Sequence, residues 1–460
     1  MLLLAHSENA QLNVVTKYGT ILDGDISVAL LDVWNEACKD TTPGTILIPN
    51  GTYPMSQVVL SGPCKAPIRL QIHATLKAPL DLKTLDPKKE WLTIQYVDNF
   101  TLSGGGILDG QGAIAWLRND CGRTIGSCNK LPNNLSLNFL RNSVIQNMTS
   151  LNSKLFHVNV FGGKNLTIDN FTIIAPNTSI NTDGIHVARI VDITIKNTII
   201  ATGDDCISIG DGTENLHVKN VTCGPGHGIS VGSLGKIPGE KPVKGIFIKN
   251  CTLINTDNGV RVKTWPNSYP GVVTDLHCDD IVMHNVNNPI LIDQEYCPYN
   301  KCQKEKPSLV KISNVSYDNI KGTSATEKAV TFICSRKVPC ERVVVGHINL
   351  TFHGDSAKSK CSNIKPILIG TQNPPICNKT ALPSPSPSPL PSPSPSPFPS
   401  PSLNPSPASS PSLSSSPSPD SSPSLSPNPS PDSSPSLSPN PSPDSSSSLS
   451  PDSFPDLWLA

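Results

Sequence analysis

Short runs of alternating apolar and polar residues repeat along the middle of the chain. They cover residues 165–174, 191–200, 216–223 and 246–254. Alternation with a period of two predicts β-strands, because successive side chains of a strand point to opposite faces. The runs turn at Asn170, Asn197, Asn220 and Asn250, which by subtraction follow one another at intervals of 23 to 30 residues.

A repeat of this length predicts units that stack and bury their apolar faces against their neighbours. We therefore expect an all-β fold, a right-handed parallel β-helix (a solenoid) with several strands per turn. A β-propeller is the alternative, but its blades repeat every 40–45 residues or so, and the sequence shows no such repeat. Helical periodicity is confined to residues 29–38, which we expect to cap the stack.

Asparagines at successive turns of a solenoid can stack and hydrogen-bond along its axis. Three of the turn residues, Asn170, Asn220 and Asn250, also lie in N-x-[S/T] glycosylation sequons. We assign these three to ladders in preference to glycan attachment. Further sequons, which agree with a secreted glycoprotein, begin at Asn50, Asn99, Asn134, Asn314 and Asn378.

Composition divides the chain into three regions. Residues 1–10 start with a short apolar fragment that cannot serve as a full signal peptide, so we interpret them as the remnant of a signal or N-terminal extension, truncated or mis-started. Residues 11–380 form the predicted β-helix. Residues 381–460 are almost entirely Pro and Ser. They cannot bury enough apolar surface to fold, so we expect a disordered tail.

The tail has a period of its own. The motif Pro-Ser-Pro-Asp-Ser-Ser recurs with Asp420, Asp432 and Asp444 spaced 12 residues apart. Alternating Ser and Pro favour a stiff polyproline II spacer and are typical of O-glycosylated stalks. With hydroxylated prolines the tail would resemble plant arabinogalactan-type wall proteins, which suggests contact with the cell-wall matrix. An unmodified linker with no role is the alternative.

The formal net charge of zero hides an asymmetry. The tail carries no Lys or Arg but five aspartates, so the rest of the chain has a formal charge of +5. A mildly basic domain suits a polyanionic partner, and ordinary surface variation would give the same excess. We expect no nucleic-acid partner, and no segment is apolar enough to span a membrane.

Fourteen cysteines, all before residue 381, include the close pairs Cys334 with Cys340 and Cys297 with Cys302. An even number of cysteines favours disulfides and an oxidising, extracellular setting. Zinc is the competing interpretation, but it needs paired CxxC spacings, and the sequence has none. We therefore predict a secreted protein.

Carboxylates cluster on two consecutive repeats, with Asp183 on one and the pair Asp204 and Asp205 on the next. Aspartate is disfavoured in strands. Stacked coils lie about 4.8 Å apart, so Asp183 is expected to face the pair. Packing like charges costs energy, which a purely structural site would avoid. It also drives carboxyl pKa values apart, as acid and base catalysis require.

The next repeats carry His227 and then Arg261 and Lys263. The repeat spacing aligns these residues with the aspartates in one stripe. Taken singly, a histidine is usually a structural residue and an Arg-Val-Lys segment usually a solvated strand end. Together they suggest acid and base groups tuned by His227, with two cations that can hold a carboxylated sugar.

Four segments carry a specific resemblance. Residues 181–183 (NTD), 203–205 (GDD), 226–228 (GHG) and 261–263 (RVK) resemble, in order, the four signature motifs of the polygalacturonase family of glycoside hydrolases. The resemblance extends over residues 11–377 and excludes the tail. The departure is Val262, where the family more often has Ile. Similarity is greatest to the plant pollen-type exo-acting members.

The resemblance implies roles for these residues. Asp204 would protonate the leaving oxygen, Asp183 and Asp205 would activate the attacking water, and His227 would support the protonation of the acid. Arg261, Lys263, Asn181 and Tyr296 would bind galacturonate. No cofactor and no metal are implied. The family also suggests disulfides, namely Cys206–Cys223, Cys334–Cys340 and Cys361–Cys377.

The expected activity is inverting hydrolysis of α-1,4-galacturonosyl linkages in de-esterified pectin, fastest at acidic pH, by a monomer in the cell wall. Exo action is favoured over endo action by residues 264–266 (TWP) and by the similarity to pollen enzymes. Other possibilities are a calcium-dependent pectate lyase, hydrolysis of rhamnogalacturonan or xylogalacturonan, and a catalytically silent pectin-binding wall protein.

Overall fold

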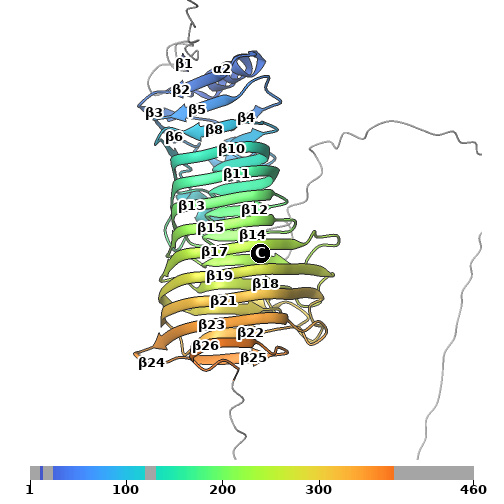
Figure 1. The fold of residues 1–460 in the computed structure, drawn as a ribbon. Helices are drawn as coiled ribbons and strands as arrows, with labels where there is room; N and C mark the ends of the chain where they lie inside the picture. Colours follow the sequence, from blue (N-terminus) through green and yellow to red (C-terminus); the bar gives the residue numbers. More distant parts are fainter. Residues whose placement is uncertain (1–10, 14–23, 120–130, 378–460) are drawn as a thin grey trace, which may run out of the picture. The chain divides into compact units, whose positions relative to one another are not determined.

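The computed structural model describes residues 11–13, 24–119 and 131–377. These residues wind into a parallel β-helix, in which long stacks of strands run along one axis (Figure 1). The predicted fold class is therefore confirmed. The predicted N-terminal remnant (residues 1–10) and Ser/Pro tail (residues 381–460) lie outside the described residues.

One stack of parallel strands forms the face that carries the motifs. Its members are β4 (Val58–Ser61), β7 (Leu92–Gln95), the first parts of β10 (Leu135–Leu151) and β11 (Val158–Ile174), β12 (Ile185–Ala188), β14 (Ile207–Ile209), β16 (Ile229–Leu234), β18 (Asn258–Thr264), β20 (Asn288–Asp293), β22 (Lys328–Ile333) and β25 (Lys358–Ser362). We call this stack the motif sheet.

A second stack of parallel strands runs beside it. It comprises β1 (Gln11–Asn13), β2 (Gly44–Ile48), β5 (Ile68–Ile72), β8 (Phe100–Ser103), the later parts of β10 and β11, β13 (Val191–Ala201), β15 (Glu214–Cys223), β17 (Val243–Ile254), β19 (Gly271–Val286), β21 (Val310–Ser324), β23 (Glu341–Phe352) and β26 (Ile367–Asn373). The first coils add β3 (Thr52–Pro54), β6 (Thr75–Lys77) and β9 (Ile107–Asp109), and β24 (Asp355–Ser356) pairs antiparallel with β23.

The core is built from rows of identical inward positions. Ile185, Ile207, Ile229, Val260 and Ile290 pair in register across five strands, and each is at most 2% exposed. Because inward and outward side chains alternate, the register that buries this row also presents a row of polar residues outside. Hydrophobic burial along the axis therefore fixes where the outward side chains of the motif sheet lie.

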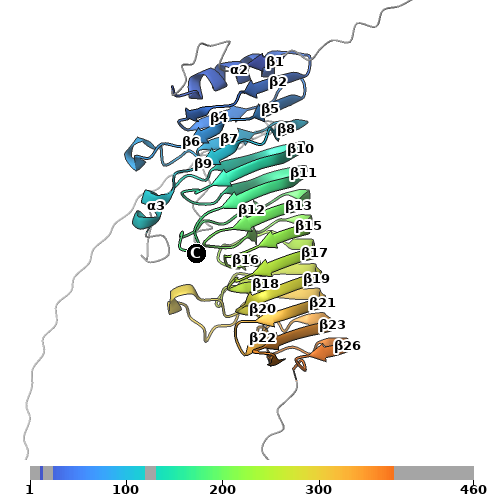
Figure 2. The ribbon, with the colours of Figure 1, turned by 90° about the vertical axis from the view of Figure 1, so that its left-hand side faces the viewer.

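The predicted helix is present and slightly longer than expected. Helix α2 (Ser27–Lys39) lies at the N-terminal end of the stack (Figures 1 and 2). It buries Leu30, Val33 and Trp34, and the Trp34 indole Nε1 donates to Ser61 O at 3.0 Å. The short helix α3 (Ala113–Arg118) and the 3₁₀ turns η1 (Leu82–Thr84) and η2 (Pro298–Asn300) lie in connections between strands. Helix α2 thus covers apolar surface at the end of the solenoid, as expected.

Asparagine ladders are present at two of the three residues assigned to them, Asn170 and Asn220, and the place of Asn250 in a ladder stays a prediction. Asn170 Nδ2 donates to Asn147 Oδ1 at 2.7 Å, and Asn220 Nδ2 donates to Asn197 Oδ1 at 2.9 Å. Between these two steps, Asn197 donates to Asp169 Oδ1 at 2.7 Å instead of to Asn170. All four predicted turn asparagines have left-handed φ angles near +50°. Asparagine tolerates this conformation better than most residues, which explains its recurrence at the turns.

Five disulfides join described residues. The three pairs implied by the resemblance are present, together with Cys38–Cys64 and Cys297–Cys302. Cys251 and Cys278 are buried free thiols. Among the described residues, no helix is long and apolar enough to cross a membrane.

Removing the Cys206–Cys223 disulfide is expected to lower the free energy of unfolding by about 3 kcal/mol. Without the cross-link the unfolded chain is no longer closed into a loop, so its conformational entropy rises. The bond spans 17 residues and links the coil after Asp205 to the end of β15. Denaturant unfolding of the double variant Cys206→Ala and Cys223→Ala measures the effect. Cys251→Ala is the matched control, since it removes a buried sulfur without a bond. Equal losses in both would show that packing alone is responsible.

Candidate active site

A pocket of about 310 Å³ opens on the motif sheet. It brings together seven of the eight residues singled out from the sequence, namely Asn181, Asp183, Asp204, His227, Arg261, Lys263 and Tyr296. Asp205 is not part of the pocket wall, and its side chain is only 1% exposed. The other lining residues are Phe156, His186, Ser208, Gly232, Ser233, Asp257, Asn258 and Pro298.

The solenoid register aligns the acidic motifs at one corner. Ile185, Ile207 and Ile229 are paired in register, and Asp183, Asp205 and His227 each precede one of them by the same interval. Backbone hydrogen bonds fix the corner, since Gly184 N donates to Asp205 O at 2.8 Å and His227 N to Asp204 O at 2.7 Å. Consecutive coils therefore deliver the acidic groups and the histidine to one place.

Two motif glycines are required by close backbone contacts. A Cβ at Gly203 would lie 2.0 Å from Ser179 O, and one at Gly228 would lie 1.9 Å from Asn258 O. Gly228 also has a φ of +89°, a region that side chains disfavour. The glycines in the GDD and GHG motifs thus allow the coils that carry Asp205 and His227 to stack at this spacing.

Asp205 is held by three donors. Ser230 Oγ and Arg261 Nη2 each donate to Asp205 Oδ1 at 2.8 Å, and Lys263 Nζ donates to Oδ2 at 2.8 Å. Burial alone would raise the pKa of Asp205, but Lys263 and Arg261 outweigh burial and lower it to about 2. The pKa of Lys263, which burial would lower, is raised by the same carboxylate. The cluster is therefore a buried, fully charged group of two cations and one anion.

Asp183 has the opposite electrostatic environment. It is 7% exposed, and burial is the main reason why its pKa is raised well above the usual value. The negative charges of Asp204 and Asp205 raise it further, while a hydrogen bond with Ser208 acts in the other direction. Two neighbouring aspartates, Asp183 and Asp205, thus have pKa values driven in opposite directions.

Asp204 is paired with His227. The His227 Nδ1 lies 2.9 Å from Asp204 Oδ1, and burial of the imidazole is outweighed by this hydrogen bond and charge, which raise the pKa of His227 to about 9. The other ring nitrogen, Nε2, lies 3.5 Å from Asp257 Oδ2. His227 therefore stays protonated beside Asp204 over a wide pH range.

Asp257 and Asn258 were not singled out from the sequence. Asn258 Nδ2 donates to His227 O at 3.0 Å, and Asn287 Nδ2 donates to Asp257 Oδ1 at 3.0 Å. The available signal was position, because Asn258 precedes Val260 by two residues, as Asp183 precedes Ile185 in the same register, and Asp257 lies just before β18. His186 was also missed, and burial lowers its pKa to about 4, so its ring is neutral.

Asn181 and Tyr296 are the first and last of the predicted site residues in the sequence, and both line the pocket. The Tyr296 ring centroid is 5.9 Å from Arg261 Cζ and 5.3 Å from Lys263 Nζ. Asn181 has a left-handed φ of +55°, and its Oδ1 accepts a hydrogen bond from Asn119 Nδ2 at 3.2 Å. The structure thus brings Tyr296 to the two basic residues, as the sequence suggested.

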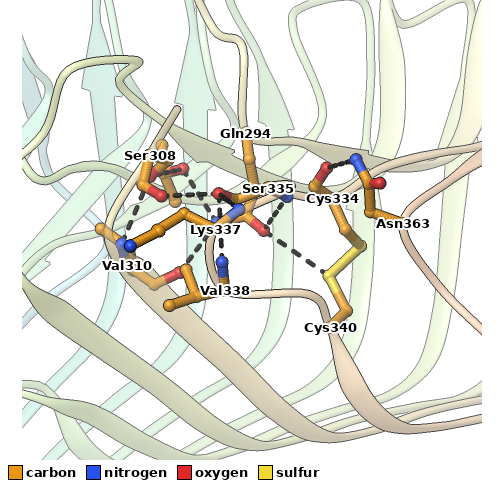
Figure 3. Close-up of a disulfide and its surroundings, with 10 residues drawn as sticks. Gln294, Ser308, Val310, Cys334, Ser335, Lys337, Val338, Cys340 and Asn363 are labelled. Carbon is orange, nitrogen blue, oxygen red and sulfur yellow. Dashed lines mark hydrogen bonds between the residues drawn. A yellow bond between two sulfur atoms is a disulfide. The ribbon is translucent and has the colours of Figure 1, made fainter. Parts of the chain in front are cut away.

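The buried Gln294 fixes the segment that presents Tyr296 (Figure 3). Its Nε2 donates to Val310 O at 2.8 Å, and its Oε1 accepts from Ser335 N at 2.9 Å. Ser335 follows the half-cystine Cys334, which is bonded to Cys340. The disulfide and this amide together anchor the base of the turn that carries Tyr296.

Asp204, Asp205 and His227 are the described residues whose ligand atoms could hold a metal ion, since these atoms lie within 4.8 Å of one another. Arg261 and Lys263 already neutralise Asp205 at 2.8 Å, however. Two cations at this distance repel a further cation. The charges of the site therefore disfavour a metal and suit an anionic ligand.

Comparison with known proteins agrees with this arrangement. The model of glycosyl hydrolases family 28 matches residues 38–374. The chain belongs to glycosyl hydrolase family 28. This family 28 member is 57% identical to a polygalacturonase of Nicotiana tabacum over 388 residues, which are 84% of this chain and 97% of the relative.

Two further similarities extend the comparison. This family 28 chain is 50% identical to an exopolygalacturonase of Oenothera organensis over 359 residues, covering 78% of this chain and 99% of the relative. The crystal structure of an exopolygalacturonase from Thermotoga maritima matches with a TM-score of 0.64 at 17% identity, covering 79% of this chain and 92% of that one. The second similarity supports the β-helical fold.

Proposed function

We propose that this family 28 glycoside hydrolase cleaves α-1,4-galacturonosyl linkages in de-esterified pectin by inverting, exo-acting hydrolysis. The observation that carries the proposal is the pocket lined by Asp183, Asp204, His227, Arg261 and Lys263, with Asp205 buried behind it and bound to both cations. The identity to the tobacco polygalacturonase supports the substrate. The identity to the Oenothera exopolygalacturonase supports exo action.

The acid in this proposal is Asp204, working as a pair with His227. As the glycosidic C–O bond breaks, Asp204 gives a proton to the leaving oxygen, and the shared proton at His227 Nδ1 keeps the pair supplied. The side chain of Asp204 is 18% exposed and lines the pocket, so it can reach a bound sugar. In this proposal His227 supplies the proton that Asp204 passes to the leaving oxygen.

The base in this proposal is Asp183, supported by Asp205. Water attacks the anomeric carbon from the opposite face, and its proton passes to a carboxylate, as inversion requires. Asp183 lines the pocket, and its raised pKa makes it a strong proton acceptor once ionised. Both oxygens of Asp205 are occupied by donors. Asp205 therefore acts on Asp183 and on the basic residues from behind the pocket wall.

Arg261 and Lys263 are proposed to bind the carboxylate of a galacturonate beside the scissile bond. Asp205 balances one of their two charges, which leaves one positive charge for the substrate. The Tyr296 ring packs beside both cations and offers a sugar-binding face. Asn181 supplies a further polar contact in the same pocket.

The proposal extends to location and partners. We propose secretion to the cell wall, action as a monomer, and contact between the Ser/Pro tail and the wall matrix. Five disulfides in the described chain support an oxidising compartment. A catalytically silent pectin-binding protein is the rival, and the intact cluster of carboxyl groups and cations argues against it.

Product analysis on de-esterified polygalacturonate at mildly acidic pH tests the function. Early release of galacturonate monomer alone is expected for exo-hydrolysis. A ladder of oligomers with falling viscosity would establish endo action instead. Unsaturated products that absorb in the ultraviolet would show that the reaction is a lyase elimination and not hydrolysis. A folded wild type with no product would favour the silent binding protein.

The pH dependence of kcat/KM should respond to the charge at position 257. Asp257 is 58% exposed and faces His227 at 3.5 Å, so removing its negative charge lowers the pKa of His227. The Asp204–His227 pair then loses its proton at lower pH, and the upper limb of the profile moves down. Because an exposed pair is weak, we expect a shift of roughly half a pH unit for Asp257→Asn and more for Asp257→Lys.

The measurement is the pH profile of kcat/KM, which reports groups of the free enzyme. Asp192→Asn is a suitable control, since Asp192 lies outside the pocket and pairs with Lys164. If the upper limb stays in place in both Asp257→Asn and Asp257→Lys, or moves further in Asp257→Asn than in Asp257→Lys, Asp257 does not act on His227.

A further inference from the structure

Four polar residues on neighbouring strands of the motif sheet form one row at the pocket. His186 on β12, Ser208 on β14, Ser230 on β16 and Arg261 on β18 pair in register, and Figure 1 shows β12, β14 and β18 in this succession. His186 and Ser208 line the pocket and are only 5% and 4% exposed. The mechanism proposed above gives no role to these two buried polar side chains.

The repeat of the solenoid relates two serine–aspartate pairs. Ser230 lies 25 residues after Asp205 and donates to its Oδ1 at 2.8 Å. Ser208 lies 25 residues (208 − 183) after Asp183. Because β12, β14 and β16 pair in register, each serine has the same position relative to the aspartate of the preceding coil. In agreement with this relation, Ser208 forms a hydrogen bond with Asp183.

The Ser208 hydroxyl has a second partner, since His186 Nδ1 lies 2.8 Å from Ser208 Oγ. A hydroxyl has one proton to donate. When Ser208 Oγ donates to Asp183, it must therefore accept from His186, and the imidazole carries its proton on Nδ1. Burial and the charge of Lys263 outweigh the charge of Asp205 and lower the pKa of His186 to about 4. Above this pH one neutral tautomer completes the chain of donors.

Asp183 depends on this hydrogen bond more than Asp205 depends on Ser230. Burial raises the pKa of Asp183, and the charges of Asp204 and Asp205 raise it further. Lys263 also faces Asp183, but its Nζ is bound to Asp205 at 2.8 Å, and it lowers the pKa of Asp183 less than the hydrogen bond with Ser208 does. Hydrogen bonds to a charged group are strong in a buried site.

We propose that Ser208 is a positioning residue for the base of the reaction, and that His186 orients the Ser208 hydroxyl. Ser208 donates one hydrogen bond to Asp183, which fixes the orientation of the carboxylate and stabilises its ionised form. His186, with its proton on Nδ1, keeps the hydroxyl turned toward Asp183. This inference rests on the proposed function for the role of Asp183 as the base.

Ser208→Ala should move the acidic limb of the kcat/KM pH profile upward by about one pH unit, because the carboxylate loses a hydrogen bond that favours its ionised form. Below the limb, kcat/KM on polygalacturonate should fall about tenfold, and above the limb it should return close to the wild-type value. Ser136→Ala is the matched control. Ser136 lies in the same row two strands before His186, and its buried Oγ has no hydrogen-bond partner among the described residues.

His186→Phe is a second variant. It keeps a ring beside Phe156, whose centroid lies 5.3 Å from that of the imidazole, and it removes the donor at Nδ1. We expect a smaller shift in the same direction, because the Ser208 hydroxyl can still reach Asp183. An acidic limb that stays in place in both variants would overturn the inference, and so would an equal loss of kcat/KM at every pH or an equal shift in Ser136→Ala.

Carbon-13 NMR titration of the aspartate carboxyl groups measures the same effect without catalysis, with Asp183→Asn to identify the signal. A wild type that does not hydrolyse polygalacturonate, together with a raised Asp183 pKa in Ser208→Ala, would reject the proposed function alone. An active enzyme whose Asp183 pKa is unchanged in Ser208→Ala would reject the positioning role alone. Nitrogen-15 shifts of His186 should place its proton on Nδ1, and a proton on Nε2 would contradict the chain of donors.

Discussion

Asp204→Asn is expected to lower kcat on polygalacturonate by roughly 10²- to 10⁴-fold, the range of a lost general acid. The amide keeps the shape of the side chain, and its oxygen can still accept from His227 Nδ1, now 2.9 Å from Asp204 Oδ1. It has no acidic proton to give to the leaving oxygen. Reducing-sugar release under saturating substrate measures the loss.

Binding separates this chemical role from a structural one. Calorimetric titration with trigalacturonate should show that Asp204→Asn still binds the trimer in the pocket. The thermal unfolding temperature of this variant should be close to that of the wild type. Retention of more than a tenth of the activity would remove Asp204 from the acid role. Loss of folding as well as activity would leave the question to His227→Gln, which should depress kcat without changing the affinity for the trimer.

Asp205→Asn should lower the free energy of unfolding by about 4 kcal/mol, because it leaves Arg261 and Lys263 buried without their counter-charge. Asp279→Asn is a matched control. Its carboxylate also lies 2.8 Å from a lysine, Lys249, but the two side chains are 41% and 60% exposed. Such an exposed pair contributes little to stability, because water and salt screen it, so we expect a much smaller loss for Asp279→Asn. Urea unfolding of the two variants compares the same substitution at the same distance.

The stability that Asp205 contributes has a defined pH window. Its folded pKa, about 2, lies below the usual value of 3.8, so the carboxylate stabilises the fold at higher pH. The contribution is complete above about pH 4 and disappears as pH falls towards 2. The difference between wild type and Asp205→Asn should therefore shrink over that range. A difference that is small at pH 7, or constant down to pH 2, would contradict a charged buried cluster.

The fold and the membership of the site followed from the sequence for physical reasons. Period-two alternation and a repeating turn asparagine specify stacked strands, since a solenoid has the same local environment in every coil. Once the stacking is known, residues at the same place in successive repeats must be neighbours. This is why the sequence places Asp183, Asp205 and His227 together.

What the sequence did not reveal depends on side-chain rotamers and on burial. Arg261 and Lys263 were expected to face the substrate, and the structure adds that both are bound to Asp205. Asp183 and Asp205 were both expected to activate the water. In the structure Asp183 lines the pocket, whereas Asp205 lies behind the pocket wall. The alternation rule gives the face on which a residue lies, and it cannot give the partner that its charged end selects.

The resistance of a solenoid to unfolding depends on its outermost coils, because each coil contacts only its neighbours and unfolding can begin at either end. The coils that carry Asp183 and Asp204 lie in the middle of the stack, between those of β7, β10 and β11 and those of β20, β22 and β25. Near the ends, Cys38 is bonded to Cys64 and Cys361 to Cys377. The disulfides thus restrain fraying at the ends, where it would start. The central coils are therefore expected to unfold last on heating and to be cleaved last by proteases.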